Sequence, residues 1–401
     1  MHVLYILSIA LSWIVALFWT QRVLSVARNL PRVTNLHNPP PVAAGSERGA
    51  PNAERPALTV IVPARNEAAA LETTLRSLLA QTIPLEIIAV DDRSTDSTGA
   101  IMDRIAAERH PPGRYLTVIH VDELPPGWLG KPHAMALAAR QAATPWLLFT
   151  DGDILFREDT LARALRYAQT SADHLVLLPT LILKTRGETM MAAVFQSLTL
   201  IAWRPWRIAD LKARRESIGM GAFNLVRRDV YHTVGGFEAA PFEVLEDLRL
   251  GHAIKRSGYR QRFVLGRGLI QLHWAPGAFG MVRNLTKNIF ATFRFRLSLL
   301  FGAWLGLSLL CLGPLAAMFG WWPIRSAGIV SVLMIATLYA LASRYYTPIR
   351  PAYVLTFPVA VALVLYAMLR STLVTLFRQG VVWRGTFYPL RELRRHAGPL
   401  R

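Results

Sequence analysis

The sequence has one cysteine and few charged residues. Cys311 is the only cysteine among 401 residues, which excludes disulfide bonds within the chain and zinc sites built from cysteines. The absence of such bonds fits a reducing compartment. Charged residues make up only 18% of the chain and hydrophobic residues 52%, a balance that is unusual for a purely soluble protein. The composition therefore indicates helices buried in protein or in a membrane.

Acidic residues are also scarce relative to basic ones. The chain has 26 Asp and Glu against 45 Lys and Arg, a formal net charge of +19. Such an excess favours anionic partners: lipid headgroups, a diphosphate or nucleic acid. No segment resembles a basic recognition helix or an aromatic RNA-binding signature, so we expect a membrane partner and no nucleic-acid partner.

Long apolar segments predict membrane spans at both ends of the chain. Val3 to Thr20 carries no charge and is long enough to cross a bilayer. Arg22, Arg28 and Arg32 follow it without a small-residue cleavage site, which predicts an uncleaved anchor rather than a signal peptide. By the positive-inside tendency, the chain after Thr20 is cytoplasmic. A buried core helix is the alternative.

Three further apolar segments lie in the last third of the chain. They are Leu297 to Trp322, Ile329 to Ala342 and Val354 to Met368. Three spans would put the arginine-rich tail after Arg370 outside, against the positive-inside tendency. The sequence leaves open whether one segment is re-entrant or interfacial, or whether the tendency fails at this end.

Strand and helix patterns alternate between these regions. Short apolar strands are predicted at Leu58 to Val62, Glu86 to Val90 and Trp146 to Thr150, with helices at Glu67 to Ala80 and Thr98 to Arg109. This alternation predicts an α/β, doubly wound, Rossmann-like and mostly parallel sheet. Ligands of such sheets bind at the carboxyl ends of the strands.

Polar residues stand at those strand ends. Asp151 and Asp153 flank Gly152 directly after the third strand. Two hard oxygen ligands suit Mg²⁺ or Mn²⁺, and the glycine lets a diphosphate approach the backbone, although a capping loop is the alternative. After the second strand, Asp92 is a candidate acceptor for a base or ribose. Asp96 is equally a candidate helix cap.

Two further motifs lie outside these strands. Gly127 to Lys131 precedes a predicted helix at Pro132 to Ala142, so Lys131 and the helix amides predict an anion site, unless Lys131 is simply solvated. Glu246 and Asp247 open an amphipathic helix, where they serve as dipole partners or in catalysis. We favour Asp247 as a general base and Glu246 as a supporting or acceptor-contacting residue.

These motifs, in this order, resemble the family 2 glycosyltransferases over roughly residues 57 to 290. The matching segments are Val62-Pro63-Ala64-Arg65-Asn66-Glu67, Val90 to Asp96, Gly130-Lys131, Asp151-Gly152-Asp153, Gly219 to Phe223, Gly235-Gly236-Phe237 and Glu246-Asp247. Leu124 to Lys131 and the tail Trp383 to Tyr388 are similar to membrane-bound members associated with hopanoid and carotenoid glycosylation.

The resemblance implies a GT-A fold, a nucleoside-diphosphate sugar donor such as a UDP-sugar, and an inverting mechanism. It also implies roles for individual residues. The nucleoside would be held by Pro63, Ala64, Arg65, Glu67 and Asp92. Asp151 and Asp153 would hold the ribose, the diphosphate and Mg²⁺ or Mn²⁺, with Asp153 the direct metal ligand. Asp247 would be the general base.

The sequence departs from the polymer-forming branch of the family. Those members carry a Gln-x-x-Arg-Trp motif after the base helix, and Trp274 to Asn288 has none. The departure favours transfer of a single sugar over processive polysaccharide synthesis. A non-catalytic, nucleotide-binding membrane scaffold is the alternative from a different class.

Aromatic and basic residues alternate in two segments flanking the proposed base. Met190 to Ser217 and Asn284 to Leu300 are predicted as interfacial helices, with an ordinary core-facing helix as the alternative for the first. Together they predict a lipid acceptor delivered from the cytoplasmic leaflet. The expected organisation is an anchor (1–22), a linker (23–56), a catalytic domain (57–290), a transmembrane region (291–373) and a basic tail (374–401), multi-pass in the cell inner membrane with the catalytic domain cytoplasmic.

Overall fold

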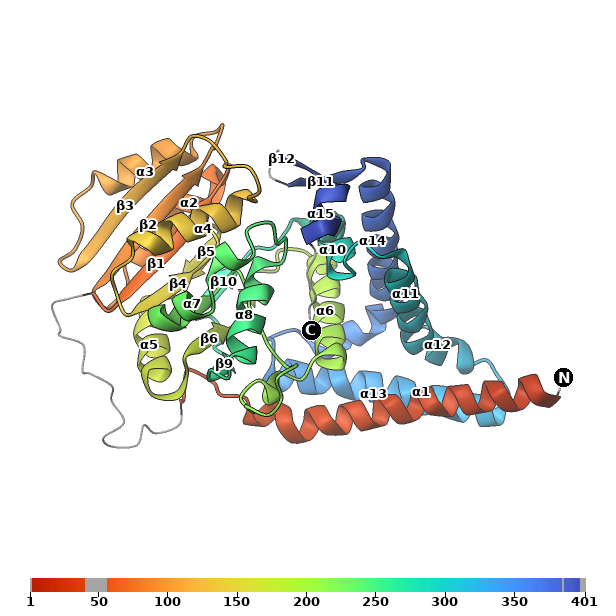
Figure 1. The fold of residues 1–401 in the computed structure, drawn as a ribbon. Helices are drawn as coiled ribbons and strands as arrows, with labels where there is room; N and C mark the ends of the chain where they lie inside the picture. Colours follow the sequence, from red (N-terminus) through yellow and green to blue (C-terminus); the bar gives the residue numbers. More distant parts are fainter. Residues whose placement is uncertain (1, 40–55, 287, 384–385, 397–401) are drawn as a thin grey trace. The chain divides into compact units, whose positions relative to one another are not determined.

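The computed structural model describes residues 2–39, 56–286, 288–383 and 386–396 (Figure 1). The chain forms two compact units. One, the sheet unit, holds Val33–Ile182 and Trp206–His273, and the other, the helical unit, holds the N-terminal residues to Arg32 together with Leu183–Pro205 and Trp274–Arg394. The segment expected as one continuous catalytic domain, 57–290, is therefore shared between the units, and residues 40–55 of the predicted linker lie outside the described residues.

The sheet unit is built on a seven-stranded sheet of order β3-β2-β1-β4-β8-β6-β9. Its strands are β1 (Leu58–Ala64), β2 (Leu85–Asp92), β3 (Arg114–Val121), β4 (Trp146–Phe149), β6 (His174–Leu177), β8 (Asn224–Arg227) and β9 (Gln261–Val264). Only β8 runs antiparallel to its neighbours β4 and β6. The α/β class with a mostly parallel sheet, predicted from sequence, is confirmed.

Helices cover both faces of this sheet because successive strand side chains point to opposite sides. Val60 and Val62 of β1 pack in a core with Leu71 and Leu75 of α2, whereas Ile61 packs in the core of the other face. The helices are α2 (Ala68–Leu79), α3 (Thr98–Ala106), α4 (Gly130–Gln141), α5 (Thr160–Ser171), α7 (Arg228–Thr233) and α8 (Glu246–Arg256). A smaller sheet pairs β5 (Ile154–Phe156), β10 (Ile270–Leu272) and β7 (Thr180–Leu181).

The helical unit contains four helices long and apolar enough to cross a membrane, one N-terminal and three C-terminal, as predicted. Its elements are α1 (His2–Asn29), α6 (Arg186–Ala202), α9 (Gly277–Thr286), α10 (Ile289–Thr292), α11 (Leu297–Cys311), α12 (Gly313–Ala317), α13 (Trp322–Tyr345), η4 (Pro351–Thr356), α14 (Phe357–Phe377), β11 (Gly380–Trp383), β12 (Thr386–Pro389) and α15 (Leu390–His396). The predicted boundary at Trp322 was wrong: this residue opens α13, with Pro323 in the first turn, where its missing N–H costs nothing.

Neither predicted interfacial helix forms as expected. α6 ends at Ala202, and Trp206 lies in a separate 3-10 turn that begins at Pro205, so Trp206 does not continue the helical face. Within α6, Met191 and Val194 are buried. The segment from Asn284 is divided into α9, α10 and α11 by a turn in which Arg294 and Phe295 have positive φ; Lys287 lies outside the described residues.

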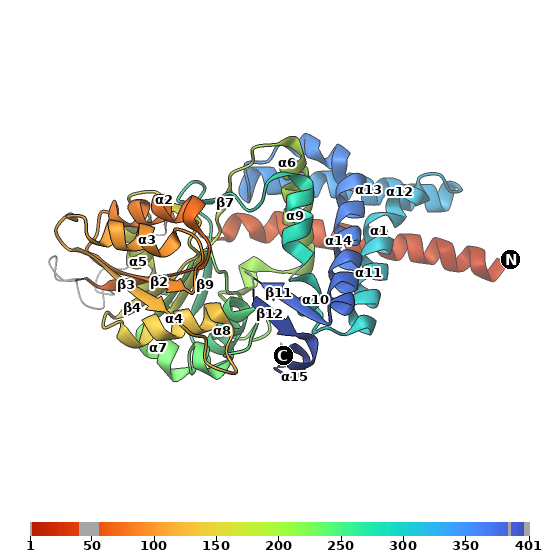
Figure 2. The same cartoon turned by 90° about the horizontal axis from the view of Figure 1, so that it is seen from above.

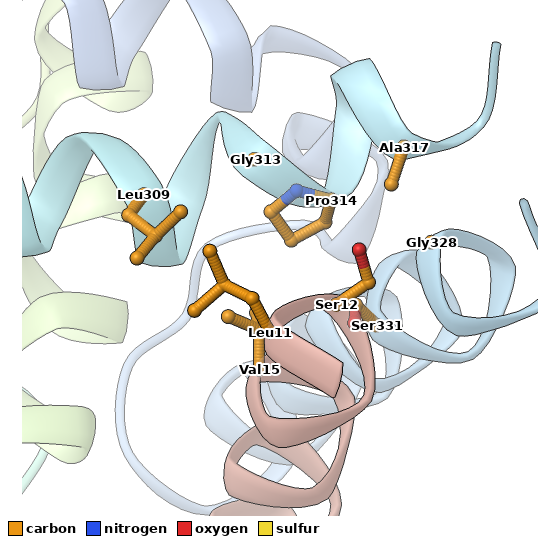
Figure 3. Close-up of a pocket in the computed structure, with 9 residues that line it drawn as sticks. All are labelled: Leu11, Ser12, Val15, Leu309, Gly313, Pro314, Ala317, Gly328 and Ser331. Atoms are coloured by element: carbon orange, nitrogen blue, oxygen red, sulfur yellow. The ribbon is translucent and has the colours of Figure 1, made fainter. Parts of the chain in front are cut away.

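Proline also shapes the first C-terminal span. Pro314 has no N–H to donate to the carbonyl of Leu310, one turn earlier, and a free carbonyl in an apolar region is costly. The indole Nε1 of Trp19, fully buried on α1, donates to this oxygen at 2.9 Å. Beside this contact a small cavity lies among α1, α11, α12 and α13, lined by Leu11, Val15 and Ser331 among others (Figure 3).

Replacing Trp19 by phenylalanine should therefore lower the free energy of unfolding by about 1 kcal/mol beyond the change in packing, because the Leu310 carbonyl loses its donor. Thermal unfolding in detergent measures this. Trp13→Phe is the matched control, since Trp13 is on the same helix and 44% exposed. Equal shifts in the two variants would contradict the role of the hydrogen bond.

Candidate active site

The carboxyl end of β2 presents a carboxylate between two guanidinium groups. Asp92, the last residue of β2, is 5% exposed. Its Oδ1 accepts from Arg93 Nε at 2.8 Å, and its Oδ2 lies 4.0 Å from Arg65 Nη1. The buried Arg65 Nε has no hydrogen-bond partner within the described residues. A buried donor without a partner is costly, so this corner is suited to a ligand with acceptor atoms.

The neighbouring loop residues hold this corner in shape. Pro63 and Ala64 end β1 with buried side chains, so they contribute backbone and surface shape to a ligand. Glu67 precedes α2, and its N–H donates to Thr98 Oγ1 at 2.9 Å. Asp96 accepts from the N–H groups of Ala68 and Thr98, at 3.3 and 2.9 Å. Asp96 therefore acts as a cap for the two helix starts.

Lys131 joins the ends of two elements far apart in sequence. Its Nζ lies 2.6 Å from Asp151 Oδ1 and 2.8 Å from Glu246 Oε1. The helix begins at Gly130, two residues earlier than predicted, so Lys131 stands in the first turn of α4 rather than before the helix. Burial lowers the pKa of Lys131, but the carboxylates of Asp151, Glu246 and Asp247 outweigh burial and raise it overall, so Lys131 is a cation.

Glu246 is the buried member of the acidic pair at the start of α8. Burial raises its pKa to about 7, against the opposing effect of Lys131 and with a further increase from Asp247. One lysine thus serves Asp151, Glu246 and Asp247, all three of which act on its pKa. The cluster has an excess of negative charge when every carboxyl group is ionised, which favours a further cation or a bound proton.

Asp247 is the accessible member of that pair, being half-buried where Glu246 is buried. Its Oδ2 accepts from the N–H of Gly221 at 2.8 Å. A Cβ on Gly221 would lie 2.7 Å from Asp151 Oδ2 and 3.0 Å from Lys131 Nζ. The same glycine therefore contacts the proposed base, the lysine and the first aspartate of the Asp151–Asp153 motif.

Backbone contacts fix the segment that carries Gly221 against α8. A Cβ on Gly219 would collide with the carbonyl of Asp247, and one on Gly251 with the carbonyl of Ile218. The side chain of Gln261 accepts from the N–H of Ile218 and donates to its carbonyl, both at 2.9 Å. Sequence reasoning noted the glycines without assigning them a role, and missed Gln261, because nothing in a β-strand pattern marks a glutamine as a backbone clamp.

The two groups of residues lie at one edge of the sheet. Gly130 packs so closely on Asp92 that a Cβ would collide with its carboxylate, while the next residue, Lys131, reaches Asp151 and Glu246. Gly152 packs on the side chains of Ala64 and Glu67, at 3.4 and 3.8 Å from its ideal Cβ position. The predicted convergence is therefore seen for the segments around Asp92, Asp151 and Asp247.

The donor chemistry of the Asp151–Asp153 loop suits Mg²⁺ or Mn²⁺. Within the part of the chain that the structure describes, no group of three or more His, Cys, Asp or Glu side chains is arranged to hold a metal. Magnesium-type sites commonly use one or two carboxylates and take their other oxygens from substrate phosphates and water. The residues therefore fit a cation that arrives with a diphosphate, with Lys131 holding Asp151.

A mostly parallel α/β sheet with lysine and carboxylates gathered at one edge is typical of enzymes acting on phosphorylated ligands. Residues 59–235 match the family model described as glycosyl transferase family 2. The protein thus contains a domain that matches glycosyl transferase family 2, as the resemblance predicted.

Two similar proteins are carotenoid glycosyltransferases from Staphylococcus aureus. The 4,4'-diaponeurosporenoate glycosyltransferase of Staphylococcus aureus strain MRSA252 is 29% identical over 206 residues, 50% of this chain and 52% of that protein. The enzyme of strain USA300 matches over the same shares. The chain therefore spans about half the length of the curated relatives it matches.

Solved structures resemble the chain over a larger share but more loosely. The mannosyltransferase PcManGT from Pyrobaculum calidifontis, in complex with GDP-Man and Mn²⁺, has a TM-score of 0.47 and 20% identity, covering 93% of this chain and 99% of that one. TarS 1–349 from S. aureus, in complex with UDP-GlcNAc, has a TM-score of 0.40 and 16% identity, covering 82% and 95%.

Glu246→Gln should flatten the dependence of thermal stability on pH. The folded protein keeps the Glu246 proton up to a pKa of about 7, whereas the ordinary pKa of a glutamate is 4.5. The stabilisation is therefore full below the lower value and is lost as pH rises through the higher one. Melting temperatures of wild type and variant across this window measure the effect. Glu123→Gln, at an exposed site, is the control and should keep the wild-type slope.

Proposed function

We propose that the protein transfers a single sugar, with inversion, from a nucleoside-diphosphate sugar to a lipid or lipid-linked acceptor. The nucleotide is UDP, and the reaction takes place at the cytoplasmic face of the cell inner membrane. The observation that carries the proposal is the cluster of Lys131, Asp151, Glu246 and Asp247 at the carboxyl edge of a family 2 domain.

The nucleoside binds, in this proposal, at the corner made by Arg65, Asp92 and the segment from Pro63 to Glu67. Asp92 supplies carboxylate acceptors for the base or ribose, and the buried Arg65 Nε supplies a donor that has no partner within the described residues. Gly130, at the start of α4, packs on Asp92. A nucleoside bound at Asp92 therefore places its diphosphate beside the first turn of α4 and Lys131.

Asp151 and Asp153 hold the ribose, the diphosphate and Mg²⁺ or Mn²⁺, with Asp153 the direct metal ligand. A bound divalent cation would neutralise charge on the leaving diphosphate. Lys131 adds a second positive charge beside Asp151 and Glu246, so the leaving group meets preorganised cations.

Asp247 is the base that takes the proton of the acceptor hydroxyl as the hydroxyl attacks the anomeric carbon. Its Oδ2 is oriented by the N–H of Gly221, and it is accessible where Glu246 is buried. Glu246 acts through Lys131 and positions it. The carboxylate of Asp247 therefore has the exposure that an incoming alcohol requires.

The lipid acceptor is supported by two independent observations. Four helices of the chain are long and apolar enough to cross a membrane. The curated relatives carry the name of a glycosyltransferase acting on a carotenoid acid, which is a lipid. A carotenoid-type acceptor follows for this chain. Processive synthesis is disfavoured because Trp274 to Asn288 lacks the Gln-x-x-Arg-Trp motif.

Asp247→Asn should lower turnover by about a hundredfold or more while donor binding is retained, because the amide accepts the Gly221 hydrogen bond but no proton. The assay supplies radiolabelled UDP-sugars and native lipids to the purified protein, and follows labelled lipid. Asp122→Asn, at an exposed site, is the control. Label found only in a water-soluble product, or in a long polymer, would contradict lipid-directed single transfer.

Metal dependence has a separate readout in nucleotide binding. Calorimetry of UDP with and without Mn²⁺ should give tighter binding with the metal, and Asp153→Ala should remove that difference. Glu158→Ala, an exposed acidic neighbour, should leave it unchanged. If UDP fails to bind in either condition, the scaffold alternative is favoured instead.

A further inference from the structure

The helical unit contains four helices long enough to cross a membrane. Both ends of the last one, α14, lie close to α6, α9 and α10. We propose that the chain crosses the bilayer three times, through α1, α11–α12 and α13, and that α14 lies along the leaflet on the side of the sheet unit. The C-terminal tail then stays on the sheet-unit side. This inference requires only that the chain is embedded in a bilayer, and it holds whichever sugar or acceptor the protein uses.

The helix α6 marks the level at which α1 leaves the membrane. Arg22 follows the apolar part of α1, and a charged residue in that position marks the boundary of a span. Its Nε donates to the Leu200 carbonyl and its Nη2 to the Trp203 carbonyl, both at 3.1 Å. These carbonyls are at the C-terminal end of α6, which therefore lies at the boundary on the sheet-unit side, where the chain continues from Arg32 into Val33.

The end of α13 reaches the same level. Thr347, two residues after α13, is hydrogen-bonded to Gln196 of α6. α13 also runs alongside α1 in two views (Figures 1 and 2). Since the C-terminal ends of α1 and α13 both lie at α6, the two helices cross in the same direction.

The start of the C-terminal part lies in this layer too. The buried carboxylate of Glu188, in the first turn of α6, accepts from the N–H of Gly277 at 2.7 Å, which ties α9 to α6. Residues 274–296 follow directly from the sheet unit and contain no span-length helix among those described. The chain therefore enters α11 from the sheet-unit side, and α11–α12 carries it across so that α13 can return.

Both ends of α14 are held in this layer. At its start, η4 packs on α6 and on the end of α13. Towards its end, Ser371 Oγ donates to the Thr286 carbonyl at 2.5 Å and accepts from the N–H of Phe290 at 3.1 Å. Beyond α14, Arg394 Nη2 donates to the Phe295 carbonyl at 3.2 Å, just before α11. A helix with its two ends at one boundary does not cross.

The exposed face of α14 is apolar and suited to contact with lipid hydrocarbon. Five large apolar side chains at helical spacing are exposed: Val359, Tyr366, Leu369, Leu373 and Phe377. The opposite face packs on α6, α9, α10 and α11, and both views show α14 running across α1 rather than beside it (Figures 1 and 2). Exposed apolar side chains on this face suit contact with lipid hydrocarbon, whereas the direction of α14 is inferred from where its two ends lie.

This arrangement removes the conflict with the positive-inside tendency. The tail arginines Arg378, Arg391, Arg394 and Arg395 then share the side of Arg22, Arg28 and Arg32. With three crossings in place of four, every arginine-rich flank is on one side of the membrane.

Single-cysteine labelling tests the topology in the full chain. Cys311, the only cysteine, is replaced by alanine, and one reporter is added at a time: Leu211→Cys in the sheet unit, Phe319→Cys between α12 and α13, or Arg391→Cys in the tail, all at exposed positions. In sealed vesicles of one orientation, a membrane-impermeant maleimide should label Leu211→Cys and Arg391→Cys from one side and Phe319→Cys only from the other.

Labelling of Arg391→Cys together with Phe319→Cys would overturn the proposal, as would labelling of all three from one side. Labelling of every variant in detergent controls for folding. Depth provides a second readout: fluorophores on Val359→Cys and Phe377→Cys should be quenched equally by lipids spin-labelled at one depth. A spanning α14 would separate the two by about 27 Å along the membrane normal and abolish one of the signals.

Discussion

The candidate site depends on the close approach of two backbones. The segment from Ile218 to Gly221 lies so near the first turns of α8 that neither Gly219 nor Gly251 has room for a Cβ. This contact brings the N–H of Gly221 to Asp247 and leaves the space beside Gly221 to Lys131 and Asp151. One segment therefore sets the positions of both the proposed base and the lysine. The side chain of Gln261 holds this segment by two hydrogen bonds to the backbone of Ile218.

The carboxyl groups around Lys131 carry more negative charge than the lysine can neutralise, and this excess favours binding of a cation or a proton. Lys131 faces the carboxyl groups of Asp151, Glu246 and Asp247, and its single positive charge compensates only part of their charge in a region where burial strengthens every interaction. A proton on Glu246 and a divalent cation near Asp151 and Asp153 relieve the same repulsion. In the proposed function, binding of a cation with the donor diphosphate would therefore be coupled to the protonation of Glu246.

Sequence patterns could predict the elements but not all of their partners. Alternating apolar strands with acidic ends, and the helix opened by Glu246, were readable because each depends on local periodicity. The pairing of Lys131 with Glu246 was not, since it is set by strand order and by where α4 begins. The extent of α6 was misjudged, because α6 ends at Ala202 and Pro205 opens a separate turn before Trp206 can join the apolar face of the helix.

The same limit applies to the membrane segments. Hydropathy measures the free energy of moving side chains into hydrocarbon, and by that measure α14 equals α1. A helix crosses the membrane only if its two ends lie on opposite sides. Polar contacts at the ends decide this, and hydropathy does not measure them. For α14 these are the hydrogen bonds of Ser371 with Thr286 and Phe290, which keep its end beside the entrance to α11. Apolar length is therefore necessary for a crossing and insufficient for it, because the hydrogen bonds of one serine side chain fix where the end of α14 lies.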